Sequence, residues 1–308
     1  MSVVMVTYNS RELLQHSLSP LTSVSAIEII VVDNASQDGT AQHVAEAYPS
    51  VNLIRSDVNN GFAKAVNAGA RIANGEVILL LNPDAIVDVK NILILRDTLL
   101  RRPDIGVIAP LLEHPGLNLA VREAGMKPSL WRVFCHYFGL SRISPDNHGL
   151  RGLYILRREN FQTTPVEWVS GACMAVPRSV WTAQGGLTER WFMYAEDVEF
   201  CLRVHRSGLA VVLSADAVGV HGLGKSSGSV QKLPSTDWMT NLYELYKSDI
   251  SHSAVQNFVW KYVFFAGMLT RAYSFGAKAV FRRKRPTADP GYIKFLFFAR
   301  EILKEDWR

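Results

Sequence analysis

Residues 77–85 read VILLLNPDA, an apolar run that ends on Asn82 and Asp84 around a proline. Consecutive large aliphatic residues are typical of a strand buried on both faces of a sheet. The run therefore presents a carboxylate at the carboxyl end of a buried strand. Ligands of open α/β sheets bind at that end, and an isolated Asp there suits a metal-bound phosphate. Asp84 is the first candidate functional residue.

The same alternation of apolar runs and helical periodicity extends over the first hundred residues. Short apolar runs predict strands, and Leu, Ala and Val at three- and four-residue spacings predict helices. Regular alternation of the two predicts an α/β fold with a mainly parallel sheet. The expected strands are 3–6, 27–32, 51–54, 77–81 and 105–109, and the expected helices are 13–21, 40–48, 62–73 and 89–101.

Beyond residue 109 the pattern is less regular. Residues 110–165 mix Gly, Pro, His and Arg with aromatic residues without a sustained period, so we expect an irregular insert. After the insert, the sequence predicts a regular stretch at 169–176, a helix from 178, a helix at 196–206, strands at 209–213 and 217–220, and helices at 237–247 and 254–281.

Composition limits the class of protein. The chain has 308 residues, of which 48% are hydrophobic, enough for one large or two small domains. Its first apolar run follows no basic segment and is shorter than the roughly 20 residues that span a bilayer. The three cysteines form no CxxC pair, so we expect reduced thiols and no zinc site. These features favour a cytoplasmic protein.

The positive charge is concentrated in the C-terminal part. The net charge is +5, yet residues 255–308 hold 11 Lys and Arg against 4 Asp and Glu, which leaves 22 against 24 elsewhere. A near-neutral body with a basic, aromatic tail argues against a nucleic-acid partner. It favours a peripheral position on an anionic membrane surface, at its cytoplasmic face. The alternatives are a solvated helical face, or packing on the body or on the second subunit of a homodimer.

Two strand-to-helix turns carry further candidates. In VVDNASQDGT a strand ends on Asp33, which can accept a hydrogen bond from a nucleobase imide or act as a helix cap. In NNGFAKAVNAG a flexible turn at Gly61 precedes Lys64 and Asn67, which are one helical turn apart. Helix N-termini favour phosphate, so the second turn predicts a phosphate contact.

A second acidic group opens a predicted helix in MYAEDVEFCLRVH. Glu196, Asp197 and Glu199 fall in its first turn, where carboxylates also complement the helix dipole. The aromatic loop 191–194 precedes them and can stack on sugar rings. From these residues alone, the acidic group can be catalytic, or it can only stabilise the helix dipole.

Residues 219–226 read GVHGLGKS and match the phosphate-loop pattern GxxxxGK[ST]. Taken literally, the match predicts an NTPase. The segment that follows, SGSVQKLPSTDW, contains Gly and Pro where the motif needs a helix N-terminus to cradle phosphates. The context therefore disfavours an NTPase.

Five motifs occur together in the order expected of family 2 glycosyltransferases, and the set resembles the rhamnosyltransferase-type branch over about residues 1–230. They are VTYNS at 6–10, VVDNASQDGT at 31–40, NNGFAKAVNAG at 59–69, LLLNPDA at 79–85 and AEDVEFCLR at 195–203. The resemblance implies a GT-A fold and an inverting transfer from a nucleotide-sugar. It also implies three parts: a donor-binding half at 1–109, an acceptor and catalytic half at 110–230, and a helical C-terminal extension at 235–308.

The resemblance also implies residue roles. Asp33 would bind the base, Asn67 would lie near the ribose or diphosphate, and Asp84 would hold Mg²⁺ or Mn²⁺. The DxD pattern of the family reads NPD here, so Asp84 is the one carboxylate of this motif. The residues expected to bind the nucleotide-sugar are Thr7, Tyr8, Asn9, Asp33, Asn59, Gly61, Lys64, Asn67, Asn82, Asp84 and Lys225.

Catalysis would depend on the second acidic group. Asp197 falls where the family has its base and would take the acceptor hydroxyl proton, and Glu196 would position the acceptor. In the same interpretation His221 ends a strand as a ligand of the metal or diphosphate, although a lone His is more often structural. Lys225 would reach the phosphates from the loop that follows.

The expected function is transfer of a hexosyl unit from a dTDP- or UDP-sugar, with dTDP-rhamnose as a candidate, to a glycan or lipid-linked glycan. The process would be synthesis of a cell-wall or cell-surface polysaccharide. Three alternatives stay open: a polyprenyl-phosphate sugar synthase, a sugar-nucleotide-binding protein without catalysis, which Asn82 makes conceivable, and, least favoured, an NTPase.

Overall fold

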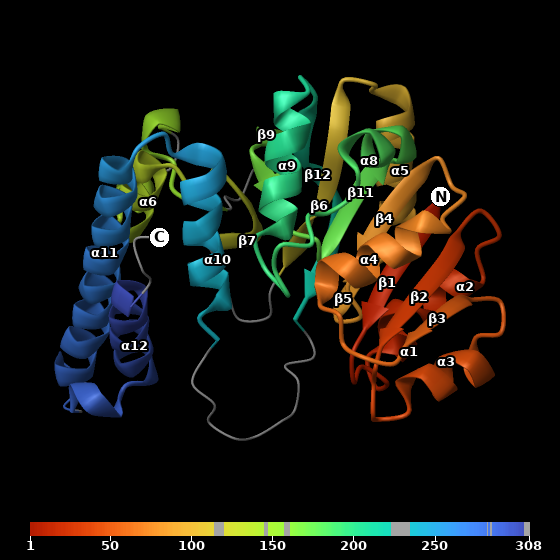
Figure 1. Ribbon diagram of the computed structural model, residues 1–308, viewed down its shortest axis with the longest axis horizontal. Coiled ribbons are helices and arrows are strands. Elements are labelled where there is room, and N and C mark those ends of the chain that lie inside the picture. The colour runs from red at the N-terminus through yellow and green to blue at the C-terminus, as the bar shows by residue number, and fades with distance from the viewer. Residues whose placement is uncertain are drawn as a thin grey trace. The chain divides into compact units, whose positions relative to one another are not determined.

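The computed structural model describes residues 1–113, 120–144, 147–156, 161–222, 235–281, 283 and 285–304 (Figure 1). The chain forms two compact units. Unit 1 comprises Met1–Gly125 and Arg157–Ser227, and unit 2 comprises Met126–Leu156 and Gly228–Arg308.

Unit 1 is built on a mixed sheet with a parallel half (Figure 1). The parallel strands, in the order β3-β2-β1-β4, are β1 (Ser2–Thr7), β2 (Glu28–Asn34), β3 (Asn52–Ser56) and β4 (Val77–Leu81). The sheet continues from β4 through β11 (Cys173–Pro177), β6 (Ile105–Glu113), β12 (Ala210–His221) and β5 (Ala85–Val87), and β9 (Thr164–Val166) pairs with β12. The expected strands and the mainly parallel first half of the sheet are confirmed.

The strand order creates a switch point between β1 and β4. From β1 the chain proceeds outward to β2 and β3, and it then returns to the other side of β1 as β4. Thr7 lies beside Asp33 in the register of β1 and β2, and β4 ends at Leu81, directly before Asn82. The polar residues that follow these strands therefore gather at the sheet edge where α/β proteins bind ligands.

Helices of unit 1 pack on both faces of the sheet. On one face Val3 and Met5 join Leu14, Ile92 and Leu95 in a single core. The other face is covered by α4 (Phe62–Arg71), which packs on β1 and β2. The remaining helices of the unit are α1 (Leu14–Ser17), α2 (Ser19–Thr22), α3 (Thr40–Ala47), α5 (Val89–Arg101), α8 (Arg178–Gln184) and α9 (Glu196–Arg206).

Gly69 allows α4 to approach the sheet closely, because a Cβ at this position would lie 2.6 Å from Val4 Cγ1 and 3.0 Å from Val32 Cγ2. Gly69→Ala is expected to lower the free energy of unfolding by about 1–3 kcal/mol through overpacking, although alanine is the better helix former. Urea denaturation of the variant measures the change. Adding Val4→Ala should recover part of the loss, because it makes room for the new methyl group. Strictly additive losses would contradict this packing argument.

Three expected elements differ in detail from the structure. The helix predicted at 13–21 is divided at Leu18 into α1 and α2. The strands predicted at 209–213 and 217–220 are one strand, β12, because its register with β6 shifts between Ser214 and Val218 without a chain reversal. The stretch predicted at 169–176 consists of β10 (Trp168–Val169), which pairs with β7 (Ala120–Gly125), and of β11.

Unit 2 is mainly helical. Its elements are α6 (Leu130–Tyr137), α7 (Leu140–Ile143), η1 (His148–Leu150), β8 (Tyr154–Leu156), α10 (Asp237–Leu245), η2 (Tyr246–Ile250), α11 (Ala254–Phe281), η3 (Pro286–Ala288) and α12 (Pro290–Lys304). The indole of Trp260 is fully buried and stacks on Tyr243, Tyr246 and Phe264 with ring centroids 5.2–5.3 Å apart. The insert at 110–165 was expected to be irregular, but part of it forms the helix α6, which packs on α11. Among the described residues, no helix combines the length and apolar character that crossing a bilayer requires.

Candidate functional site

The loops after β1 and β2 are joined by side-chain hydrogen bonds. The Asp33 carboxylate is buried and accepts hydrogen bonds from Thr7 Oγ1 at 3.0 Å and from the Ser36 N–H at 3.1 Å. Asn9 adopts a left-handed conformation with φ of 51°, and its Oδ1 accepts from the Gln37 N–H at 2.8 Å. Tyr8 lies between them with its side chain exposed. The structure brings all four predicted residues to one edge; their roles in binding the nucleotide stay predictions.

Asn34 organises the next turn and was not identified from the sequence. Its buried Nδ2 donates to Asn59 Oδ1 at 2.7 Å and to the Gly61 carbonyl at 3.1 Å. Its Oδ1 accepts from the Asn60 N–H at 3.0 Å. The available signal was a fully polar amide at the end of an apolar strand, which must find partners when it is buried. Asn59 and Gly61 are thereby held against β2.

The turn at Gly61 also meets the aromatic loop 191–194. Gly61 has φ of 81°, and a Cβ there would lie 2.3 Å from the Phe192 carbonyl oxygen. The N–H of Phe62 donates to the same carbonyl at 2.8 Å. Phe192, Met193 and Tyr194 are exposed. The backbone of the aromatic loop is therefore fixed at Phe192, whose side chain is 55% exposed.

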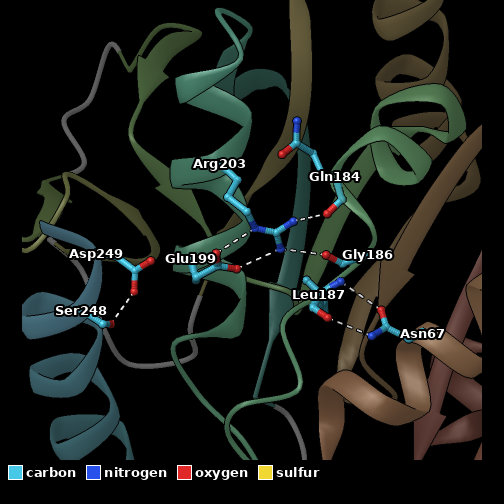
Figure 2. Close-up of polar contacts among 8 residues, drawn as sticks. All are labelled: Asn67, Gln184, Gly186, Leu187, Glu199, Arg203, Ser248 and Asp249. Atoms are coloured by element: carbon cyan, nitrogen blue, oxygen red, sulfur yellow. Dashed lines mark hydrogen bonds and ion pairs between the residues drawn. The ribbon is translucent and has the colours of Figure 1, made fainter.

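Figure 2 shows how the segment before the aromatic loop is held. Asn67 Oδ1 accepts from the Leu187 N–H and its Nδ2 donates to the Leu187 carbonyl, both at 2.9 Å. Asn67 Nδ2 also donates to Glu189 Oε1 at 3.0 Å. Asn67 thus has a structural role in this chain, and its contact with ribose or diphosphate stays a prediction. Lys64 is exposed in the first turn of α4.

Arg203 holds the other side of this segment (Figure 2). Its Nε and Nη2 donate to the two Glu199 carboxylate oxygens at 2.7 and 2.9 Å, and Nη2 also donates to the Gly186 carbonyl at 2.8 Å. Nη1 donates to the Gln184 carbonyl. A guanidinium that uses its planar fork in this way fixes both partners. Of the acidic residues at the start of α9, Glu199 therefore serves the fold.

Asp197 and Glu196 differ in their surroundings. Asp197 Oδ2 accepts from the Gly171 N–H at 3.0 Å, and Oδ1 accepts from the Val198 N–H at 2.7 Å. Burial raises the pKa of Asp197, and these backbone donors oppose the rise. Glu196 is 3% exposed, and its Oε2 accepts no hydrogen bond from any described residue. Burial and the charge of Asp197 raise the pKa of Glu196 to about 8. Burial thus raises the pKa of both carboxyls, and the Gly171 and Val198 amides stabilise the ionised form of Asp197.

Glu196→Gln is expected to stabilise the protein increasingly as the pH rises. The unfolded chain has the ordinary pKa of 4.5 and the folded chain a pKa of about 8, so ionisation of Glu196 costs the folded state stability across this window. Gln imitates the protonated acid and does not ionise. The melting temperature of the variant relative to wild type should therefore increase by at least about 2 °C between pH 5 and pH 8.5. An exposed control, Glu46→Gln, should show no such trend, and a parallel pH dependence in Glu196→Gln and wild type would refute the assignment.

Asp84 and His221 converge at the end of β12. His221 Nε2 lies 3.2 Å from Asp84 Oδ1, and the Gly222 N–H donates to the Asp84 carbonyl at 3.2 Å. His221 Nδ1 lies 3.0 Å from Oε1 of Glu123, a buried residue of β7. Burial lowers the pKa of His221, but the hydrogen bonds to Asp84 and Glu123 outweigh it and raise the pKa to about 9. The sequence did not single out Glu123, which lies on another strand.

With the Nε2 proton released, His221 would join Asp84 as the donor set of an open divalent-cation site. A carboxylate oxygen and an imidazole nitrogen suit Mn²⁺, and Mg²⁺ also accepts one carboxylate with phosphate oxygens and waters. Among the described residues, no group of three or more His, Cys, Asp or Glu forms a closed site. Metal-ligating His residues commonly direct their second nitrogen to a carboxylate, as His221 does to Glu123. The remaining coordination positions would be left for substrate.

The NPD turn and the acidic pair lie close together. The Asn82 N–H donates to the Ala172 carbonyl at 2.9 Å, and the neighbouring Gly171 N–H is bound by Asp197. The Ala85 N–H closes the turn on the Asn82 carbonyl at 3.0 Å. Lys225 lies outside the described residues. Of the GVHGLGKS match, residues 219–221 end β12, and residues 223–226 lie outside the described part.

Comparisons with known proteins identify the family of the chain. Residues 2–160 match glycosyl transferase family 2. The chain is 32% identical to the N-acetylglucosaminyl-diphospho-decaprenol L-rhamnosyltransferase of Mycobacterium tuberculosis, over 73% of this chain and 77% of the relative. It is 29% identical to a low-salt glycan biosynthesis hexosyltransferase of Haloferax volcanii, over 68% of this chain and 63% of the relative.

Solved structures support the fold. A mannosyltransferase from Pyrobaculum calidifontis in complex with GDP-Man and Mn²⁺ superposes with a TM-score of 0.57 at 16% identity, over 98% of this chain and 84% of that one. GalNAc-T7 with UDP, GalNAc and Mn²⁺ superposes with a TM-score of 0.56 at 15% identity, over 80% of this chain and 48% of that one. The expected GT-A fold is confirmed. The chain belongs to glycosyl transferase family 2 and is a nucleotide-sugar glycosyltransferase.

Proposed function

We propose that the enzyme transfers a rhamnosyl unit from dTDP-rhamnose to a lipid-linked glycan precursor in cell-surface polysaccharide synthesis, with inversion at C1. The catalytic part of the proposal rests on the Asp197 carboxylate. It accepts hydrogen bonds from the Gly171 and Val198 amides and lies beside the Asn82 turn. The choice of sugar and acceptor is supported by the 32% identity to a rhamnosyltransferase whose name states a lipid-diphosphate acceptor.

Asp197 is suited to act as the base. Its two oxygens accept hydrogen bonds from the Gly171 and Val198 amides, which fix the carboxylate at the start of α9. An acceptor hydroxyl can donate to this carboxylate, which takes its proton as the hydroxyl oxygen bonds to C1. The bond from C1 to the diphosphate oxygen breaks on the opposite face, and the electron pair leaves with the nucleoside diphosphate. Glu196, as the neutral acid, would position the acceptor by donating a hydrogen bond.

The leaving group requires positive charge. Asp84 and His221 would hold Mg²⁺ or Mn²⁺, which when bound supplies neutralisation of the diphosphate charge. Asp33, Thr7 and Tyr8 would bind the base from the edge of β1 and β2. Lys64, exposed in the first turn of α4, and Lys225 would add positive charge toward the phosphates.

The proposal is tested by incubating the full-length enzyme with dTDP-rhamnose, UDP-GlcNAc or GDP-mannose, Mn²⁺ and a lipid-linked glycan acceptor, and assigning the product anomer by NMR. Rhamnosyl transfer with inverted configuration is the expected result. Transfer to a polyprenyl phosphate alone would identify a polyprenyl-phosphate sugar synthase. Nucleotide binding without turnover on any acceptor would indicate a non-catalytic binding protein, and ATP hydrolysis would indicate an NTPase. Each of these three results would overturn the proposal.

A further inference from the structure

One face of α11 presents apolar side chains to solvent along the whole helix. The opposite face packs into unit 2, where Trp260, Phe264 and Met268 are fully buried. The exposed residues recur at spacings of three, four and seven, so they form one stripe. The stripe consists of Val255, Val259, Tyr262, Leu269, Tyr273 and Val280, among which Val255 and Tyr273 are 71% and 77% exposed.

The charged residues of α11 lie away from this stripe. Lys261 is buried and its Nζ donates to the Leu303 carbonyl at 3.3 Å. Arg271 lies over the Tyr137 ring with its Cζ 4.9 Å from the centroid, and Lys278 extends over the Phe275 ring. At 100° per residue, none of the three falls on the stripe. The stripe is about 40 Å long, and an exposed apolar surface that extends this far marks an interaction site.

The basic residues near the C-terminal end of the stripe indicate which partner covers it. The exposed Arg283 and Arg285 follow the C-terminal end of α11. Helix α12 packs beside α11 (Figure 1). It exposes Ile293 and Leu296, with the basic residue Lys294 between them. An apolar cavity of about 480 Å³ opens at the same end of the helix, between the stripe and η3. The cavity is lined by Tyr273, Gly276, Ala277, Val280, Phe281, Pro286 and Tyr292.

We propose that the stripe of α11 is a docking surface for an anionic lipid bilayer. A bilayer offers apolar contact to Leu269 and Val280 together with negative headgroups to Arg283 and Arg285. The tyrosines suit the boundary between the two, because each has an apolar ring and a polar tip. A second copy of the chain would present the same basic residues, so self-association lacks this complementarity. The inference concerns lipid binding alone and is independent of the sugar transferred.

The test is flotation of the full chain with vesicles of phosphatidylcholine, with and without phosphatidylglycerol. Wild type should float with the anionic vesicles. Leu269→Glu combined with Tyr273→Glu should reduce binding at least about tenfold, because two charges replace apolar contacts. Arg283→Ser combined with Arg285→Ser should also reduce it about tenfold, and only on anionic vesicles. Ile143→Glu, an equally polar change at a 77% exposed residue of unit 2, is the matched control and should bind as wild type does.

Two results would overturn the proposal. The first is absence of wild-type flotation, or equal flotation of wild type and the stripe variant. The second is a wild-type dimer, seen by sedimentation without vesicles, that the stripe variant abolishes, because the stripe would then be a subunit interface. The single variant Tyr273→Glu repeats the test with less risk to folding, and thermal melts verify that each variant is folded. Failure of the enzyme to transfer rhamnose would leave the flotation results unchanged, so the two proposals fail separately.

Discussion

Replacing Asp197 by asparagine is expected to lower kcat by about 10²- to 10⁴-fold, the usual contribution of a positioned general base. Asparagine has nearly the same shape and can keep one of the two hydrogen bonds from the Gly171 and Val198 amides, because only one of its terminal atoms is an oxygen. It cannot take a proton from the acceptor hydroxyl. Binding of the nucleotide-sugar should be unchanged, because the loss concerns an interaction made during transfer.

Turnover and calorimetric titration with the donor nucleotide separate these two effects. Asp104→Asn, at an exposed aspartate paired with Arg102, is the matched control and should retain wild-type kcat. If Asp197→Asn kept more than about a tenth of kcat, a base contribution of this size would be excluded. If it lost donor binding as well, Asp197 would act in binding or folding.

Replacing Asp84 by alanine is expected to abolish the metal-dependent part of donor binding. The carboxylate lies 3.2 Å from His221 Nε2, so both would coordinate the same ion with the diphosphate. Removing one of two protein ligands should weaken nucleotide binding in the presence of Mn²⁺ by about 10²-fold or more, and binding without metal should change little. Titration of dTDP, UDP, GDP and ATP with and without Mn²⁺ measures both quantities.

Glu123 provides a graded comparison for Asp84. It contacts His221 Nδ1 and would orient the imidazole without touching the metal. Glu123→Gln should therefore weaken Mn²⁺ affinity less than Asp84→Ala does, by about 10- to 100-fold. Direct titration of Mn²⁺, followed by electron paramagnetic resonance, measures this effect without any turnover. Metal-independent binding of wild type would exclude the site, and ATP preference insensitive to Asp84→Ala would overturn the donor assignment.

The sequence predicted parts of the site as far as local pattern allows. Asp84 was a candidate because a buried strand ends directly before it, and Asp197 because the resemblance to family 2 glycosyltransferases implies a base at this position; both roles stay predictions. Glu123 was not identifiable, since it lies 98 positions before His221 and contacts it only when β7 and β12 are folded. The contacts of Asn34 with the turn at 59–61 and of Asn67 with Leu187 were missed for the same reason, because hydrogen bonds between segments distant in sequence leave no local period.

The sequence by itself determined the parallel half of the sheet, the limits of α9 and α11, and the family. The strands and helices depend on burial within one element, which the spacing of apolar residues records directly. The family was indicated by the resemblance of the five motifs. Only the tertiary structure decided that β12 is one strand, that residues 126–156 pack with the C-terminal helices, and that burial raises the pKa of both Glu196 and Asp197. Each of these depends on which distant groups a residue meets, and two adjacent carboxyls in one helical turn differ only through the burial and the hydrogen-bond donors that the fold gives each of them.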